Sequence, residues 1–265
     1  MKKILSATSL GLLLSALLIL PSCFETDESN KAFRCFGTLY GSFASGYTVL
    51  SDDGVFLYPT NESILKAVPD LANANNIRRV FFWFNVVGDN QPAQLVRGQA
   101  YDINIVANGQ NYGSSADDLI DIYDNTAASD TLWAHPQPLV SVSEGQSWVA
   151  NGYINLCTYF MYSYTSPFSM DLAYNSSCDI DTENNIVTVT LCYNSTATSA
   201  TNSAYTYFHY RLPDDLQGKL KVDKKVTFKI RGMLDTTNTQ KDIATIQCAY
   251  ADVKETRPTF QLFSE

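Results

Sequence analysis

Residues 80–87 read Val-Phe-Phe-Trp-Phe-Asn-Val-Val and are apolar at every position except Asn85. Successive side chains of a β-strand point to opposite faces of the sheet, so a half-exposed strand alternates between polar and apolar residues. This run is apolar at both odd and even positions. It therefore predicts a central strand that is covered on both faces.

Short strands with tight turns are predicted on both sides of this run. Residues 51–54 read Ser-Asp-Asp-Gly, and the Asp-Gly pair supplies the positive φ that a tight hairpin requires. A short helix is expected over residues 64–71, broken at Pro69. Further β-prone runs lie at 35–40, 47–50, 55–58 and 99–106. About five or six short strands with one helix are typical of a small barrel, and we predict an OB-like domain over residues 34–108.

The carboxy-terminal half predicts a second β domain. Residues 109–145 are rich in glycine, serine, proline and aspartate, and we interpret them as a linker. Residues 146–265 contain repeated strand signals and no long helix, which is typical of an antiparallel sandwich. These signals lie at 153–164, 168–174, 186–193, 205–211, 226–230 and 243–250. The predicted fold class is therefore mainly all-β, with an N-terminal OB-like small barrel followed by a C-terminal antiparallel β-sandwich.

Residues 1–22 have the pattern of a bacterial lipoprotein signal peptide. Lys2 and Lys3 form a positive start, residues 4–20 are apolar, and Leu20-Pro21-Ser22-Cys23 is a lipobox. A transmembrane anchor is the alternative, because the apolar stretch is nearly long enough to span a bilayer. However, four serine or threonine residues interrupt it, and it stops at a small-residue cleavage pattern. We therefore expect lipidation of Cys23 with acyl chains such as palmitate, which would anchor the protein to a membrane leaflet.

Residues 23–33 are expected to form a flexible acidic tether. The run 24–30 is polar and contains three carboxylates, so it cannot bury enough apolar surface to fold. Acidic residues directly after the lipidated cysteine resemble the export signal of Bacteroidota surface lipoproteins. We therefore expect an outer-membrane lipoprotein, for which exposure at the cell surface and a periplasm-facing position both remain open.

Composition and missing motifs exclude several function classes. The formal net charge is −9, so the chain lacks the clustered lysine and arginine that phosphate binding needs, and nucleic acid is not an expected partner. With only two histidines, His135 and His209, multi-histidine metal sites are largely excluded. The sequence contains no nucleophile elbow, P-loop, dinucleotide-binding glycine motif or zinc-protease motif. We predict no enzymatic activity, no catalytic residue, no cofactor and no metal.

Two patterns near residue 180 allow both a structural and a functional interpretation. Asp179-x-Asp181-x-Glu183 begins like a calcium loop, but Asn184 stands where the loop needs glycine, so we predict a metal-free hairpin turn. Cys178 and Cys192 flank this turn and could form a disulfide across the hairpin. The alternative is that all cysteines beyond Cys23 are small buried apolar residues. These are Cys35, Cys157, Cys178, Cys192 and Cys248, an odd number that prevents complete pairing.

Tyrosines are concentrated in two of the predicted sandwich strands. They are Tyr159, Tyr162, Tyr164, Tyr205, Tyr207 and Tyr210. Exposed tyrosines form rigid amphipathic surfaces on which glycans can stack, and OB barrels also bind oligosaccharides. The alternative is that alternate rings simply fill the core of the sandwich.

Several short segments together resemble the NigD-like lipoproteins of Bacteroidota. They are the lipobox, the segment Asp53–Asn61, Arg78-Arg79-Val80, and Trp148 followed by residues 152–156. The resemblance covers nearly the whole mature chain and implies an OB-like domain followed by a β-sandwich. It carries over no catalytic residue, and members of the family are of unknown function. The family name derives from a bacteriocin operon.

The leading functional hypothesis is a non-enzymatic binding or interaction module, held to the membrane by its N-terminal lipid. Its partner would be an unidentified protein or glycan. The alternatives are a glycan-binding accessory lipoprotein and a bacteriocin-associated or immunity factor. Asp130-Thr131-Leu132 and Asp235-Thr236-Thr237 also resemble Bacteroidota O-glycosylation sites, so Thr131 and Thr236 are candidate sites of modification.

Overall fold

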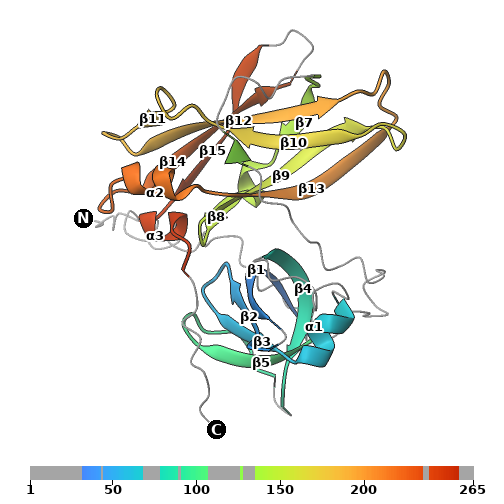
Figure 1. Cartoon of the computed structure of the whole chain (residues 1–265), viewed down its shortest axis with the longest axis vertical. Helices are drawn as coiled ribbons and strands as arrows, with labels where there is room; N and C mark the ends of the chain where they lie inside the picture. Colours follow the sequence, from blue (N-terminus) through green and yellow to red (C-terminus); the bar gives the residue numbers. More distant parts are fainter. Residues whose placement is uncertain are drawn as a thin grey trace, which may run out of the picture.

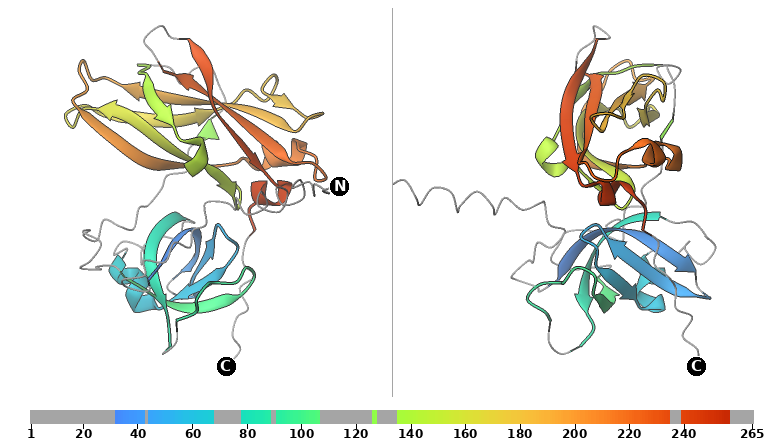
Figure 2. Two further views of the ribbon diagram at one scale, coloured as in Figure 1. Left: turned by 180° about the vertical axis from the view of Figure 1, so that it is seen from behind. Right: turned by 90° about the vertical axis from the view of Figure 1, so that its left-hand side faces the viewer.

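The structure is a computed structural model, and it describes residues 32–42, 44–67, 78–88, 91–106, 126–127, 135–234 and 239–256. These residues form two β domains, a small barrel and a larger sandwich, stacked one on the other (Figure 1). Views from behind and from the side show the same stacking (Figure 2). Each domain has its own hydrophobic core. No helix in the described ranges is long and apolar enough to cross a bilayer.

The amino-terminal domain is a closed barrel with the strand order β1-β2-β3-β5-β4. Its strands are β1 (Phe33–Ser42), β2 (Gly46–Ser51), β3 (Phe56–Pro59), β4 (Arg78–Val86) and β5 (Ala100–Ile105). Neighbouring strands are antiparallel except β3 and β5, which are parallel. Helix α1 (Asn61–Ala67) lies between β3 and β4 in the chain. This five-stranded barrel has the form of an OB fold and confirms the predicted class.

Strand β4 contains the apolar run from which the fold was predicted. Val80, Phe82 and Phe84 are completely buried in the barrel core. Phe81 and Trp83 face the other way and are only partly buried, although Phe81 stacks on Phe36 with the ring centroids 4.2 Å apart. The prediction of a strand covered on both faces therefore holds fully for the inner face and partly for the outer one.

Helix α1 begins earlier than the sequence predicted. Its first turn is capped by Thr60, whose hydroxyl oxygen accepts a hydrogen bond from the Ser63 backbone N–H at 3.2 Å. A threonine in this position satisfies one of the N–H groups that the first turn of a helix leaves unpaired. The helix therefore starts at Asn61 rather than at Ile64, and residues 68–71 of the predicted helix lie outside the described part of the chain.

The carboxy-terminal domain packs two sheets against each other. One has the order β15-β14-β12-β10-β6 with β11 beside β12, and the other has the order β13-β9-β7 with β8 beside β9. The strands are β6 (Thr126–Ala127), β7 (Leu139–Val142), β8 (Trp148–Ala150), β9 (Tyr153–Tyr162), β10 (Phe168–Ala173), β11 (Ile180–Asp181), β12 (Ile186–Ser195), β13 (Asn202–Arg211), β14 (Val226–Met233) and β15 (Gln240–Cys248). The all-β prediction is therefore confirmed.

The larger sheet is mixed rather than purely antiparallel. β12 and β14 are parallel, as are β10 and β6. After β12 the chain crosses to the other sheet as β13, passes through helix α2 (Asp214–Lys219) and returns as β14. This crossover places β14 beside β12 in the same direction, which a direct hairpin could not do.

Two short strands lie within residues 109–145, the range interpreted as a linker. β6 pairs with β10, and β7 pairs with β9 across a bulge between Leu139 and Ser141. Both strands are very short, and Pro136 and Pro138 stand directly before β7, so the sequence carries little strand signal there. A short 3-10 helix, Glu144–Gln146, follows β7, and helix α3 (Tyr250–Val253) follows β15.

Candidate functional site at the domain junction

A two-residue turn of the sandwich reaches the barrel. Strands β8 and β9 pair Ala150 with Tyr153, which leaves Asn151 and Gly152 as the turn, with φ angles of 48° and 82°. Two positive φ angles characterise a type I′ hairpin, for which Asn-Gly is the preferred sequence. A Cβ atom at Gly152 would lie 2.9 Å from the backbone nitrogen of Glu255, so no larger residue fits without movement. The turn lets the Asn151 side-chain amide donate to the Tyr40 hydroxyl at 3.0 Å.

A buried ion pair of the barrel lies at the centre of the junction. Arg79 of β4 is fully buried and the Asp52 side chain is 3% exposed. The guanidinium donates to both carboxylate oxygens, from Nη1 to Oδ1 and from Nη2 to Oδ2, each at 2.6 Å. Such a two-point pair is the strongest geometry for these groups, but it is stable in a buried setting only when further partners complete it.

The sandwich supplies these further partners. Arg79 Nη2 also donates to Asn155 Oδ1 at 2.8 Å, and Trp148 Nε1 donates to Asp52 Oδ2 at 2.8 Å. The Tyr153 ring lies 4.9 Å from the guanidinium carbon, in a cation–π contact. Strands β8 and β9 carry all three residues, so separating the two domains would leave a buried ion pair without its partners. The network therefore couples the barrel to the sandwich.

His209 extends this network inside the sandwich. It lies opposite Asn155 in the β13–β9 ladder, and its Nδ1 contacts Asn155 Oδ1. That oxygen can only accept, so Nδ1 carries a proton and donates to it. Burial first, and the nearby Arg79 charge second, hold the pKa of His209 well below its ordinary value of 6.5. Nε2 has no hydrogen-bond partner among the described residues, which suits a packed side chain rather than a general base.

The state of His209 predicts a dependence of stability on pH. Because the folded protein keeps the ring neutral while the unfolded chain protonates it near pH 6.5, the unfolded state binds more protons below that pH. Stability should therefore fall as pH is lowered from about 7 towards 5, with a slope from this group of at most about 1.4 kcal/mol per pH unit. Urea unfolding across this range should show a smaller pH dependence in His209→Gln. His135→Gln, which removes the exposed histidine, should leave the dependence intact, and equal slopes in all three proteins would contradict the assignment.

A cluster of aromatic rings lies beside the polar network at the domain junction. Phe36 of the barrel lies 5.0 Å from Trp148 and 5.0 Å from Tyr207 of the sandwich, measured between ring centroids. Trp148 and Tyr207 also meet edge to face at 5.6 Å. Burial raises the pKa of Tyr207 to about 12, so its hydroxyl stays protonated. The junction thus combines apolar contact with a completed ion pair, as expected of two domains held in one arrangement.

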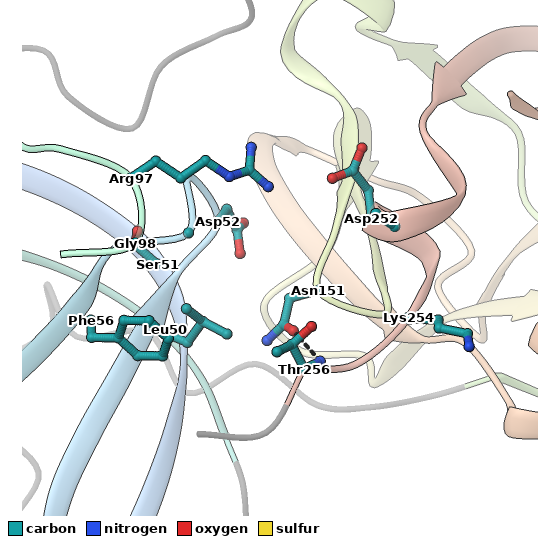
Figure 3. Close-up of a pocket in the computed structure, with 12 residues that line it drawn as sticks. Leu50, Ser51, Asp52, Phe56, Arg97, Gly98, Asn151, Asp252, Lys254 and Thr256 are labelled. Carbon is teal, nitrogen blue, oxygen red and sulfur yellow. Dashed lines mark hydrogen bonds between the residues drawn. The ribbon is translucent and has the colours of Figure 1, made fainter. Parts of the chain in front are cut away.

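A pocket of about 210 Å³ with a mixed polar and apolar lining opens beside this network, between the two domains (Figure 3). The barrel contributes the turn after β2 and the segment around Arg97. The sandwich contributes Asn151, helix α3 and Thr256. Arg97 and Asp252 extend towards each other from opposite walls, whereas Lys254 turns away (Figure 3).

A second candidate surface, here called the aromatic end, lies at one end of the sandwich, to the right in Figure 1. It consists of the connection from β9 to β10, with Tyr162, Tyr164 and Phe168, and of the adjoining connection from β12 to β13; each connection runs from one sheet of the sandwich to the other. Tyr164 is 80% exposed and Phe168 is 42% exposed. The Tyr162 ring meets both, at 5.1 and 6.0 Å between centroids. Phe168 of β10 pairs with Ser195 of β12, so the two connections lie side by side.

The structure divides the six predicted tyrosines between core and surface. Tyr210 is buried and donates to the Met170 carbonyl at 3.1 Å, and Tyr207 belongs to the junction. Tyr159 and Tyr205 face each other in the ladder on the outer side of their sheet. Tyr162 and Tyr164 belong to the aromatic end.

The other predicted site residues have different positions. Cys178 and Cys192 are both free thiols: β12 pairs Cys192 with Asp171, and Cys178 lies exposed in the turn before β11. The register therefore separates the two sulfurs instead of placing them across one hairpin. Asp181 accepts from the backbone N–H groups of Glu183 and Asn184, each at 3.0 Å, as in a hairpin turn. No cluster of three or more metal-binding side chains occurs in the described ranges. Cys23, Thr131 and Thr236 lie outside the described residues.

Sequence reasoning missed the chemistry of the junction. Asp52 was predicted only as a turn residue, and Arg79 contributed only to a family resemblance. The alternation of side chains along the strand does place Arg79 on the same face as Phe81 and Trp83. A charged side chain on that face needs either an ion-pair partner or contact with solvent. Nothing in the local sequence indicates that the partners would come from residues 52, 148 and 155.

Comparisons with known proteins identify the fold. No protein-family model and no curated protein matches the chain. Among solved structures, a provisionally described toxin-related protein of Parabacteroides distasonis ATCC 8503 is 14% identical, with a TM-score of 0.54 over 83% of this chain and 95% of that one. A provisionally described lipoprotein of Bacteroides fragilis NCTC 9343 is 12% identical, with a TM-score of 0.53 over 82% of this chain and 98% of that one.

A NigD-like immunity protein of Bacteroides caccae ATCC 43185 also shares the fold. It is 15% identical, with a TM-score of 0.51 over 79% of this chain and 91% of that one. The resemblance to NigD-like proteins that the sequence indicated is thus confirmed at the level of the fold. Identities this low carry no residue roles from one protein to the other.

Proposed function

We propose that this protein is a cell-envelope lipoprotein without enzymatic activity, and that the aromatic end of its sandwich binds an uncharged glycan. The cluster of Tyr162, Tyr164 and Phe168, in which Tyr164 and Phe168 are exposed and Tyr162 packs against the core, is the observation that carries this proposal. Exposed aromatic rings provide rigid amphipathic contact area at little cost in conformational entropy.

The chemistry around these rings favours an uncharged ligand. Residues 158–170 and 194–206, which include both connections and their flanks, contain no charged side chain, although the whole chain has a net charge of −9. Serine, threonine and asparagine fill the positions between the aromatic residues. Hydroxyl and amide groups can exchange hydrogen bonds with sugar hydroxyls, whereas a charged ligand would find no counter-charge here. The same composition is typical of antibody loops that bind varied ligands.

The lipid anchor would leave this surface accessible. β1 starts at Phe33, ten residues after Cys23, and ten residues span at most about 36 Å. The anchor would therefore hold the barrel close to the membrane, while the aromatic end belongs to the other domain. This arrangement suits a protein that presents a binding surface away from its leaflet.

The anchor makes a direct prediction. Cys23→Ala removes the only atom that the lipobox offers for acylation, so the variant should be released from membranes or accumulate as the uncleaved precursor. Membrane fractionation with intact-mass measurement distinguishes these products from the acylated protein. Cys178→Ala, which removes an exposed thiol, should remain membrane-bound like the natural chain. A processed Cys23→Ala protein that still partitions with membranes would contradict lipidation.

A glycan array probed with residues 24–265 tests the ligand class, because this fragment retains every described residue. We expect binding to one or more uncharged glycans. Tyr164→Ala should weaken that binding by at least about tenfold, as the loss of a central aromatic contact usually does. Tyr58→Ala is the matched control, since Tyr58 is a 39%-exposed tyrosine on β3 of the barrel. No glycan bound, or equal loss in both variants, would count against the proposal.

An immunity role is the second candidate. The structural relatives include one called a NigD-like immunity protein and another described as toxin-related, and this is the only observation that favours it. An immunity factor binds a toxin protein, so its producer should lose protection when the gene is deleted. Full protection after deletion would argue against this role.

A further inference from the structure

The pocket at the domain junction has features that the aromatic end does not share. Its twelve lining residues come from both domains, and they include four charged side chains: Asp52, Arg97, Asp252 and Lys254. Which of these charges remain available decides what the pocket can hold.

Two of the four charges are already engaged. Asp52 forms the two-point pair with Arg79 and also accepts from Trp148, so its charge is neutralised by Arg79 and three of its about four acceptor sites are used. Lys254 turns away from the pocket (Figure 3) and places its Nζ 5.3 Å from the centre of the Tyr250 ring. The pocket therefore presents one positive group, Arg97, and one negative group, Asp252.

The two remaining charges differ in how they are positioned. The exposed Arg97 side chain lies over Gly54, where a Cβ atom would come within 3.1 Å of its Nε, so the absence of a side chain at Gly54 leaves room for it. Asp252 accepts from the Ala249 backbone N–H at 3.1 Å, and its carbonyl accepts from Gly152 at 2.9 Å. A carboxylate fixed in this way loses little entropy when it binds a ligand.

Arg97 and Asp252 face each other without meeting. Both are among the described residues, and they form no ion pair with each other. The space between them belongs to the pocket of about 210 Å³. This volume is enough for a small molecule. Leu50 and Phe56 add an apolar patch to the barrel wall.

We infer that this pocket binds a small zwitterion, namely a free α-amino acid. The planar guanidinium of Arg97 matches a carboxylate with two parallel hydrogen bonds, and the Asp252 carboxylate accepts from an ammonium group. The apolar patch would contact an aliphatic side chain. Because each charge comes from a different domain, the ligand would bridge barrel and sandwich. The site is separate from the aromatic end, so either can fail without the other.

Thermal unfolding of residues 24–265 with each of the common amino acids in turn tests this inference. We expect at least one aliphatic amino acid to raise the melting temperature, since a ligand that binds only the folded state stabilises it. Its N-acetyl derivative, which lacks the ammonium, and its amide, which lacks the carboxylate, should each bind at least about tenfold more weakly in calorimetric titration. No stabilising amino acid, or equal binding of either derivative, would overturn the proposal.

Substitutions then locate the site. Arg97→Gln should reduce the affinity for the amino acid by at least about tenfold, and Asp252→Asn should do the same. Arg231→Gln is the matched control, because the Arg231 side chain is 43% exposed and its partner, Asp242, lies on β15 outside the pocket. Asp252 also accepts a hydrogen bond from Ala249 directly before α3, so Asp252→Asn can lower the stability of the protein. In that case the affinity of Arg97→Gln for the amino acid still tests the proposal. Unchanged affinity in Arg97→Gln would overturn the proposal.

Discussion

Arg79→Met is expected to destabilise the protein by about 3–5 kcal/mol, because it leaves the buried Asp52 carboxylate without its countercharge. Methionine fills much of the same space, so the loss reports the charge and its hydrogen bonds rather than a cavity. Arg79 donates four hydrogen bonds in the structure, to Thr38, Asp52 (twice) and Asn155. Urea unfolding followed by tryptophan fluorescence measures the change in free energy.

Two further variants isolate the cause. Arg231→Met removes the arginine of an exposed pair with Asp242, whose side chains are 43% and 56% exposed, and should cost less than about 1 kcal/mol. Adding Asp52→Asn to Arg79→Met should recover part of the loss, because the amide can still accept from Trp148 without burying an unpaired charge. If Arg79→Met costs no more than Arg231→Met, the ion pair does not hold the junction.

Phe82→Asp is expected to unfold the barrel. Phe82 is completely buried in the barrel core, and an unpaired carboxylate there costs several kcal/mol, comparable with the total stability of a small domain. Val87→Asp is the control, since Val87 lies just after the same strand and is 48% exposed. Circular dichroism and limited proteolysis should show loss of the barrel in Phe82→Asp alone.

Trp83→Asp refines this test of β4. Trp83 is only partly buried, on the outer face of the strand, so its replacement should cost less than that of Phe82. A soluble, normally melting Phe82→Asp protein would show that the inner face of β4 does not form the core. Equal damage from both substitutions would show that the outer face is as important as the inner one.

Local patterns in the sequence predicted most of the architecture. The apolar run 80–87 located β4, and the Asp-Gly pair located the β2–β3 turn, since both signals depend on neighbouring residues alone. The start of α1 was missed because Thr60, its cap, follows a proline at the end of a strand. The crossover from β12 through β13 to β14 was also missed, because parallel pairing depends on where the chain goes next and not on either strand's own pattern.

The candidate sites are formed by residues that are far apart in the chain. The sequence does not show which of these residues come into contact. Cys178 and Cys192 flank one turn, yet pairing of Cys192 with β10 separates them. Tyr210 and Tyr164 are indistinguishable by residue type, but strand parity buries Tyr210, whereas Tyr164 is exposed in the turn between β9 and β10. Arg97 and Asp252 come from different domains, so only the folded chain shows that they share a pocket.

The most direct test of the proposed binding role is to map the ligand footprint by hydrogen–deuterium exchange. Residues 24–265 would be compared with and without the strongest glycan ligand, at a concentration that saturates the protein. We predict slower exchange in residues 162–168 and 195–202, with no change in β2 and β3 of the barrel. Protection confined to the barrel strands, with none in residues 162–168 and 195–202 of the sandwich, would contradict the aromatic end as the binding surface.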